Sequence, residues 1–183
     1  MTDRRTRQIA AVIGSARATD DEERVATELG EAAITAGFRV VTGGLGGVMR
    51  AASRGARSST RYVNGDVIGV LPTYDAEHAN EFIDIPICTG LNHGRNLVVV
   101  ATADVVFVVG GRAGTLSEIA LAWQLGKPVI TVGSSAGWGT RLAGEPIDDR
   151  RDDHVHGPCE PGAAVALATK LLLVGRKPPR AFP

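Results

Sequence analysis

Short apolar runs alternate along the chain with longer segments in which apolar residues recur every three or four positions. The runs lack the apolar–polar alternation of a strand exposed on one face, which is typical of strands buried on both faces of a parallel sheet. Strands that alternate with helices predict an α/β fold, here a three-layer, Rossmann-like, doubly wound parallel sheet. The predicted strands are Ile9–Ile13, Arg39–Thr42, Val67–Leu71, Val105–Val109 and Val129–Val132.

The first two helical segments each have two distinct faces. In the first, Gly37 follows at the position of a left-handed cap, and the apolar face consists of Val25, Leu29, Ala32 and Ala36. In the second, a face of small residues allows close packing on a sheet, opposite a stripe of arginines that we expect to be solvated. The small face consists of Val48, Ala52, Gly55 and Ala56, and the stripe of Arg50, Arg54, Arg57 and Arg61.

Three more helices are expected in the second half of the chain. The apolar stretch Leu97–Val109 is too long for one strand, so we divide it at Asp104 into a buried helix, from about Asn92 to Ala103, and a strand. The last helix is expected at Pro161–Val174, because proline suits a first helical turn. Between them a helix is expected at Thr115–Leu125, with an inward face of Leu116, Ile119, Ala120 and Trp123.

A length of 183 residues predicts a single domain, residues 1–183. We expect an ordered core at about residues 8–174 and loose ends at Met1–Gln8 and Gly175–Pro183. Basic and acidic residues number 20 each, and aromatic residues make up only 4%. The chain therefore offers neither a global positive field nor a stacking platform, so nucleic acid is not an expected partner.

The cysteine content and the lengths of the apolar runs predict the cellular compartment of the protein. Two cysteines are too few for a disulfide framework and indicate a reducing environment. The apolar run near the start of the chain is shorter than the core of a signal peptide. The longest apolar run elsewhere is shorter than the ~20 residues of a membrane span. We expect a cytoplasmic protein that does not enter a membrane.

Three predicted strands end in glycine-rich turns that lead into helices. They are Gly14-Ser15-Ala16-Arg17, Thr42-Gly43-Gly44-Leu45-Gly46-Gly47 and Gly110-Gly111-Arg112-Ala113-Gly114-Thr115. The carboxyl ends of parallel strands share one edge, where such folds bind ligands. Glycine lets a ligand approach the backbone, and a helix N-terminus offers unpaired N–H groups and partial positive charge. The three turns together predict a phosphorylated small-molecule ligand.

These turns match neither the GxGxxG fingerprint nor the P-loop. The run Thr42–Met49 resembles the GGGxxGLM motif of the LONELY GUY family, and Gly110–Glu118 resembles its PGGxGTxxE motif. The resemblance spans about Ile9–Val132, with consistent strand spacing. The end of the chain, Val129–Leu173, is similar to the molybdenum-cofactor carrier-like proteins of the same superfamily.

The resemblance implies a Rossmann-like protein that forms a homodimer or homotetramer. LONELY GUY enzymes release the base from a nucleoside 5′-monophosphate, and by motif position their catalytic arginine and glutamate fall on Arg95 and Glu118. Gly110 stands in place of the motif's proline, and Arg112 in place of its second glycine. With the Gly94-Arg95-Asn96 neighbourhood, these departures look more like the carrier-like branch.

The residues themselves leave two interpretations of Glu118 open. A carboxylate there is able to stabilise positive charge on a ribose or to activate water, while Arg95 clamps a phosphate or keeps Glu118 ionised. Alternatively, Thr115-Leu116-Ser117-Glu118 has the pattern of a capping box, in which the glutamate bonds back to the helix start. His93 is a further candidate for the same pocket, although a structural role is the simpler expectation.

Two further groups of residues carry weaker signals. Asp152, Asp153, His154 and His156, with Cys159 nearby, superficially resemble a metal cluster. Their spacing fits no zinc pattern well and a surface strand explains the histidines equally, so no metal site is expected. The arginine stripe is the only support for a third alternative, binding of single-stranded DNA.

Together these features favour a protein that binds a phosphorylated nucleotide- or pterin-type small molecule, as a molybdenum-cofactor carrier does. The alternative is a nucleoside 5′-monophosphate phosphoribohydrolase that uses Arg95 and Glu118. We expect no required cofactor, and a nucleotide monophosphate or the molybdenum cofactor as the bound molecule. The expected ligand-binding residues are Gly14, Ser15, Gly43, Gly44, Gly46, Gly47, Met49, Gly110, Gly111, Arg112, Gly114 and Thr115.

Overall fold

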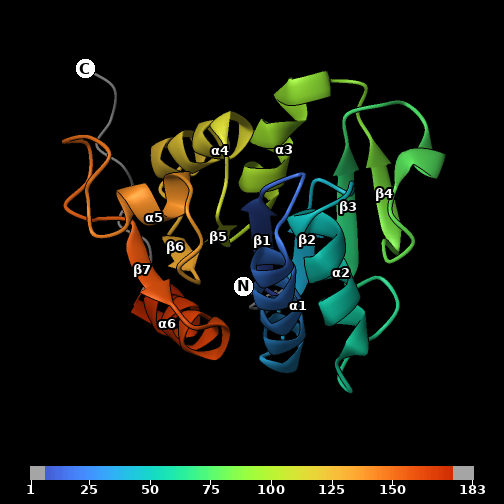
Figure 1. Ribbon diagram of the computed structural model, residues 1–183, viewed down its shortest axis with the longest axis horizontal. Helices are drawn as coiled ribbons and strands as arrows, with labels where there is room; N and C mark the ends of the chain where they lie inside the picture. The colour runs from blue at the N-terminus through green and yellow to red at the C-terminus, as the bar shows by residue number, and fades with distance from the viewer. Residues whose placement is uncertain (1–6, 175–183) are drawn as a thin grey trace, which may run out of the picture.

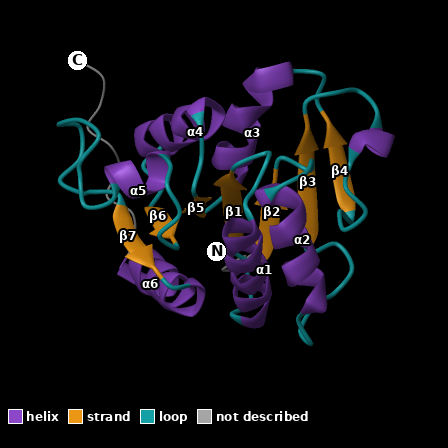
Figure 2. Ribbon diagram, in the orientation of Figure 1, coloured by secondary structure: helices purple, strands orange, loops and turns teal. Residues whose placement is uncertain are grey.

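The computed structural model describes residues 7–174, which form a seven-stranded sheet with helices on both faces (Figures 1 and 2). All neighbouring strands are parallel, in the order β4-β3-β2-β1-β5-β6-β7. The predicted α/β fold is confirmed, whereas most of the predicted loose ends lie outside the described residues. The strands are β1 (Ile9–Gly14), β2 (Arg39–Thr42), β3 (Val67–Leu71), β4 (Ile85–Cys88), β5 (Val105–Val109), β6 (Val129–Val132) and β7 (His156–Cys159).

The two strands that the sequence did not predict, β4 and β7, are the edges of the sheet. Both contain a proline, in the sequences Ile-Pro-Ile-Cys and His-Gly-Pro-Cys. An edge strand hydrogen bonds on one side only, so it tolerates proline and partial exposure. β7 begins at His156, so His154 precedes the strand and does not share a strand face with it.

The helices cover the sheet in two layers (Figure 1). One layer packs with one hydrophobic core and consists of α1 (Asp20–Thr35), α2 (Val48–Ser58) and α6 (Pro161–Val174). The other packs with a second core and consists of α3 (Arg95–Thr102), α4 (Ala113–Gln124) and α5 (Trp138–Leu142). Single 3-10 turns are η1 (Ala76–His78) and η2 (Asn92–Gly94). Across residues 7–174 no helix has the length and apolar character needed to cross a membrane.

Alternate residues of the central strands face the two cores. In β1, Ala10 and Val12 face the α1–α2–α6 layer, and Ala11 and Ile13 face the α3–α4–α5 layer. All four are buried. A period of two with apolar residues on both faces is what produced the unbroken apolar runs in the sequence.

Helices α1 and α2 approach each other at backbone distance. A Cβ added at Gly30 of α1 would meet the Ala52 carbonyl of α2, and one at Gly55 would meet the Thr27 carbonyl. The buried side of α1 is therefore turned toward α2 as well as toward the sheet. The apolar face predicted for this helix is confirmed at Val25 and Leu29, which are buried, but is wrong at Ala36, which is the C-cap. The buried side also contains Ala26, Ala33 and Ile34.

The predicted arginine stripe makes contacts within the chain, and its last member, Arg61, lies beyond the end of α2. Arg50 pairs with Glu81 and lies over the Phe82 ring, and Arg57 lies over the Tyr62 ring. The other two donate to oxygens of α1, Arg54 to Thr27 Oγ1 and Arg61 to the Thr35 carbonyl. The stripe thus connects α2 with α1 and with the segment before β4.

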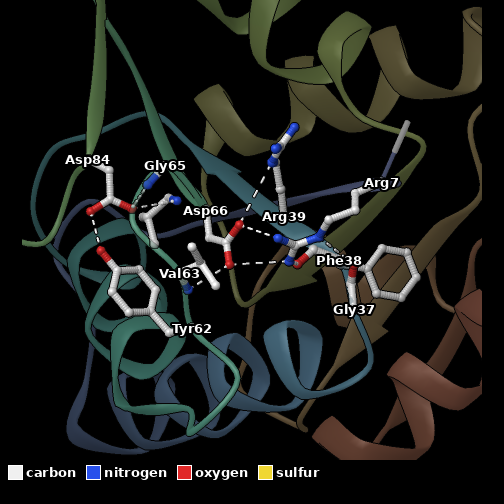
Figure 3. A network of polar contacts seen from close by, with 10 residues as sticks. Arg7, Gly37, Phe38, Arg39, Tyr62, Val63, Gly65, Asp66 and Asp84 are labelled. Carbon is white, nitrogen blue, oxygen red and sulfur yellow. Dashed lines mark hydrogen bonds and ion pairs between the residues drawn. The ribbon is translucent and has the colours of Figure 1, made fainter. Parts of the chain in front are cut away.

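A polar network closes the amino edge of the strands (Figure 3). The Asp66 side chain, 2% exposed, accepts hydrogen bonds from Arg7 Nη1 at 2.5 Å and from the Val63 N–H at 3.0 Å. Arg39 Nε lies 3.8 Å from the same carboxylate. Arg7 also donates to the carbonyl before β2, at Phe38. Asp66 therefore holds the start of β1, β2 and β3 together.

Replacing Asp66 with alanine is expected to lower the free energy of unfolding by about 2–4 kcal/mol, because it removes the buried carboxylate that accepts from the Val63 N–H and from the partly exposed Arg7 guanidinium. Urea denaturation measures this loss. Glu28→Gln removes an exposed ion pair with Arg24 and is the control, expected to leave the midpoint nearly unchanged. Equal effects of the two substitutions would contradict the structural role of Asp66.

Candidate functional site

A cavity of about 550 Å³ opens at the carboxyl edge of the sheet. Strands β2, β1 and β5 are adjacent, so the glycine-rich turns that follow them meet there. The cavity is lined by Val12, Ile13, Gly14, Ser15, Ala16, Arg17, Gly43, Leu45, Met49, Pro72, Asn92, His93, Arg95, Asn96, Arg112, Gly114, Thr115 and Glu118. Three arginines and one acidic residue, Glu118, are among these lining residues.

The expected site residues divide into two groups. Those that line the cavity are Gly14, Ser15, Gly43, Met49, Arg95, Arg112, Gly114, Thr115 and Glu118. Those that do not are Gly44, Gly46, Gly47, Gly110 and Gly111. Gly47 and Gly110 both have a φ of 60°. A Cβ at Gly47 would overlap the backbone of Ser15, and one at Gly110 would overlap Glu22 Oε1, so these glycines permit close packing of the turns.

Several lining residues were not among the predicted ligand-binding residues. Arg17 belongs to the first glycine-rich turn, and Asn92, His93 and Asn96 belong to the segment that follows β4. His93 was named only as a further candidate for the pocket, and it does line the cavity. This segment contains no glycine-rich turn, so only His93 and, through the family resemblance, Arg95 were named in it.

The N-terminus of α4 faces the cavity. The helix begins at Ala113 with Arg112 as N-cap, and its first backbone hydrogen bond runs from the Leu116 N–H to the Arg112 carbonyl. The N–H groups of residues 113–115 therefore have no carbonyl partner within the helix. No acidic side chain occupies this first turn. With the helix dipole, the turn is suited to an anion.

Glu118 and Arg95 form a buried pair inside the cavity. Arg95 Nη1 lies 3.6 Å from Glu118 Oε1, and Glu118 is 7% exposed. Burial raises the pKa of Glu118 to about 7, and the positive charge of Arg95 opposes that rise. Burial also lowers the pKa of Arg95, which its attraction to Glu118 opposes. The carboxyl group is thus poised to exchange a proton near neutral pH.

The capping-box interpretation of Glu118 is wrong. α4 starts two residues before Thr115, so Thr115 lies within the helix and no side-chain cap bond forms there. The capping box in this part of the fold belongs to α1, where Thr19 and Glu22 bond reciprocally. Glu118 instead projects from the second turn of α4 into the cavity.

Two neighbours fix the positions of Arg95 and of the α4 turn. A Cβ at Gly43 would overlap the Arg95 guanidinium, so glycine at this position leaves the room that Arg95 occupies. Asn96 Nδ2 donates to Ser117 Oγ at 3.0 Å, which ties α3 to α4.

A buried hydrogen-bond chain joins two of the glycine-rich turns. Ser15 Oγ donates to Glu22 Oε1 at 2.9 Å and accepts from the Gly111 N–H at 3.3 Å. Glu22 Oε2 accepts from the Thr19 N–H at 2.9 Å. The turn after β1 is therefore held against the turn after β5, and the cavity wall between them is rigid.

The fold and the glycine-rich edge define a Rossmann-like α/β protein of the superfamily to which the sequence motifs pointed. Residues 7–156 match the SLOG cluster4 family, and the chain belongs to this family. An uncharacterized protein of Archaeoglobus fulgidus is 39% identical over 121 residues, which cover 66% of this chain and 77% of the relative.

Two solved structures of molybdenum-cofactor proteins are similar to this chain over most of its length. The molybdenum cofactor binding protein of Rippkaea orientalis superposes with a TM-score of 0.79 at 30% identity, over 92% of this chain and 99% of that one. The molybdenum cofactor carrier protein of Chlamydomonas reinhardtii superposes with a TM-score of 0.75 at 31% identity, over 91% and 99%. The expected likeness to the carrier-like branch is confirmed.

Glu118 is expected to make stability fall with rising pH. Its pKa of about 7 in the folded protein lies above the ordinary value of 4.5, so between these values the native state keeps a proton that the unfolded state has lost. The stabilisation is complete below about pH 4.5 and is lost as pH rises through 7. The side chain of Glu118→Gln does not ionise, so this variant should not show the loss. Its free energy of unfolding is expected to rise relative to that of wild type by about 2–3 kcal/mol between pH 5 and 8.

Urea denaturation at several pH values measures that gain. Glu28→Gln alters an exposed carboxylate in the same way and serves as control, with a curve expected to run parallel to wild type. A Glu118→Gln curve that also ran parallel would show that Glu118 ionises normally.

Proposed function

We propose that this protein binds a phosphorylated small molecule of nucleotide or pterin type in the cavity at the carboxyl edge. The observation that carries this proposal is the meeting of the α4 N-terminus with Arg17, Arg95 and Arg112 around one cavity. A phosphate seated on the first turn of α4 gains backbone N–H donors and the helix dipole. Guanidinium groups add charge-assisted, two-pronged hydrogen bonds.

The remaining walls suit the rest of such a ligand. Leu45 and Met49 supply apolar surface for a planar ring, while Asn92 and His93 supply donors and acceptors. A volume of about 550 Å³ matches a nucleotide-sized molecule. The similarity to proteins that are named for binding or carrying the molybdenum cofactor supports that cofactor as cargo.

An acidic side chain in the α4 turn is expected to weaken phosphate binding without weakening the fold. Gly114 is the second residue of α4, and a Cβ there meets nothing within 4 Å. Aspartate favours a helix N-terminus but repels a phosphate seated on it. Gly114→Asp should therefore weaken binding of AMP about tenfold or more, as measured by calorimetry.

Gly162→Asp is the matched control. Gly162 is the second residue of α6 and is equally open, but it does not line the cavity. Its substitution should leave AMP affinity unchanged, and both variants should keep the wild-type melting temperature. If Gly114→Asp binds AMP as wild type does, the phosphate does not sit on α4. Adenosine, tested in parallel, isolates the contribution of the phosphate.

A second candidate function rests on the Arg95–Glu118 pair. Cleavage of an N-glycosidic bond builds positive charge on the ribose, which an ionised Glu118 would stabilise or relieve by activating water. The buried position of Glu118 inside the cavity and its pKa of about 7 fit such a role. This candidate is a nucleoside 5′-monophosphate phosphoribohydrolase.

Incubation with AMP and chromatography of free adenine separate the two candidates. A hydrolase should release adenine at a rate that rises with pH through about 7, as Glu118 ionises, and Glu118→Gln should lower the rate by at least about a hundredfold. Glu28→Gln is the control for a carboxylate outside the cavity. Tight binding of AMP without release of adenine eliminates the hydrolase and leaves the binding protein.

A further inference from the structure

A second cluster of ionisable side chains lies at the amino end of β7, away from the cavity. Asp153, His154 and His156 each present a ligand atom, and these atoms all lie within 4.8 Å of one another. None of the three lines the cavity. Because β7 is parallel to the other strands, its amino end lies at the opposite edge of the sheet.

The imidazole of His156 is the unusual member of this cluster. Its Nε2 atom is buried and makes no hydrogen bond within residues 7–174. The nearest carboxylate oxygen, Asp153 Oδ1, is 3.4 Å away. Buried nitrogen atoms without a partner are rare in folded proteins and call for an explanation.

The distance between His156 Nε2 and Asp153 Oδ1 offers an explanation for the unpaired nitrogen. In a tetrahedral zinc site the metal–ligand bonds are ~2.0–2.2 Å, so neighbouring ligand atoms are about 3.3 Å apart. The separation of His156 Nε2 and Asp153 Oδ1 is therefore the separation expected of two ligands of one metal ion.

The carboxylate of Asp153 is held in place for this role. Arg151 Nη2 donates to Asp153 Oδ2 at 2.5 Å, which leaves Oδ1 directed toward His156 and the backbone N–H of His154. Arg151 is fixed in turn, because Nη1 donates to the carbonyls of Trp123 and Lys127 and its guanidinium lies 4.4 Å over the Trp123 ring. Carboxylates that bind a metal are typically held by a hydrogen bond from an outer-shell group, which here is Arg151.

The imidazole of His154 lies next to that of His156. The His154 and His156 rings meet edge to face, with centroids 4.4 Å apart. His154 is exposed, so its ring turns toward a metal at little cost.

We propose that Asp153, His154 and His156 bind one divalent transition-metal ion, with Zn²⁺ as the best fit. Two imidazoles and one carboxylate suit Zn²⁺, whereas Mg²⁺ and Ca²⁺ require oxygen ligands. Water fills the remaining position. The sequence spacing argued against a metal, but it could not show that Arg151 orients Asp153.

Zinc titration of untagged protein in competition with a chromogenic chelator tests the site. We expect one equivalent of Zn²⁺ per chain, no displacement by excess Mg²⁺, and intense visible bands of four- or five-coordinate geometry when Co²⁺ replaces Zn²⁺. Absence of stoichiometric binding at micromolar Zn²⁺, or weak six-coordinate Co²⁺ bands, would overturn the proposal.

Variants locate the ion. His154→Ala and Asp153→Asn should each weaken Zn²⁺ binding about tenfold or more, and His154 is exposed, so its loss should not unfold the protein. His78→Ala removes another exposed histidine and should leave Zn²⁺ affinity unchanged. Unchanged affinity in His154→Ala, or loss of binding in Cys88→Ser or Cys159→Ser instead, would refute the assignment. Melting curves of each variant without metal show that the fold is retained.

Discussion

The parallel alignment of β2, β1 and β5 is the constraint on which the site depends. Three adjacent strands that run in one direction must release their turns at one edge, and these turns have to share a small volume. They fit because side chains are absent where the backbones touch. A Cβ at Gly14 would overlap the Val109 carbonyl, and one at Gly47 would overlap the Ser15 carbonyl. The cavity exists because these contacts hold its walls together.

The sequence predicted the centre of the sheet better than its edges, and the reason is burial. Strands covered on both faces need apolar residues at every position, so β1 and β5 appear as unbroken apolar runs. The edge strands β4 and β7 have no such requirement, and both contain proline. Asn92 and Asn96 were missed for another reason, because the segment before β5 has no glycine-rich turn to mark it as part of the cavity.

The misinterpretation of Glu118 has a different cause. A Thr-x-x-Glu pattern caps a helix only where the backbone is non-helical at the threonine. Here Gly111, with a φ of 106°, turns the chain early enough for α4 to begin at Ala113. The same pattern does cap α1 at Thr19 and Glu22. The side-chain spacing is identical in the two cases, so the backbone conformation at the threonine, extended at Thr19 and helical at Thr115, separates a cap from a carboxyl group in the cavity.

Both candidate functions place the phosphate on the first turn of α4, and they differ in whether it also contacts Arg95 beside Glu118. A phosphate bound by Arg95 competes with Glu118 for that guanidinium and adds negative charge beside it, which raises the pKa of Glu118 and keeps it protonated. A protonated carboxyl group donates a hydrogen bond, and this suits a protein that only holds its ligand. A phosphate bound by Arg112 and the first turn of α4 leaves Arg95 paired with Glu118 at 3.6 Å. Glu118 then ionises more readily, as hydrolysis requires. Contact between the phosphate and Arg95 would therefore separate the two functions proposed for this cavity, binding and hydrolysis.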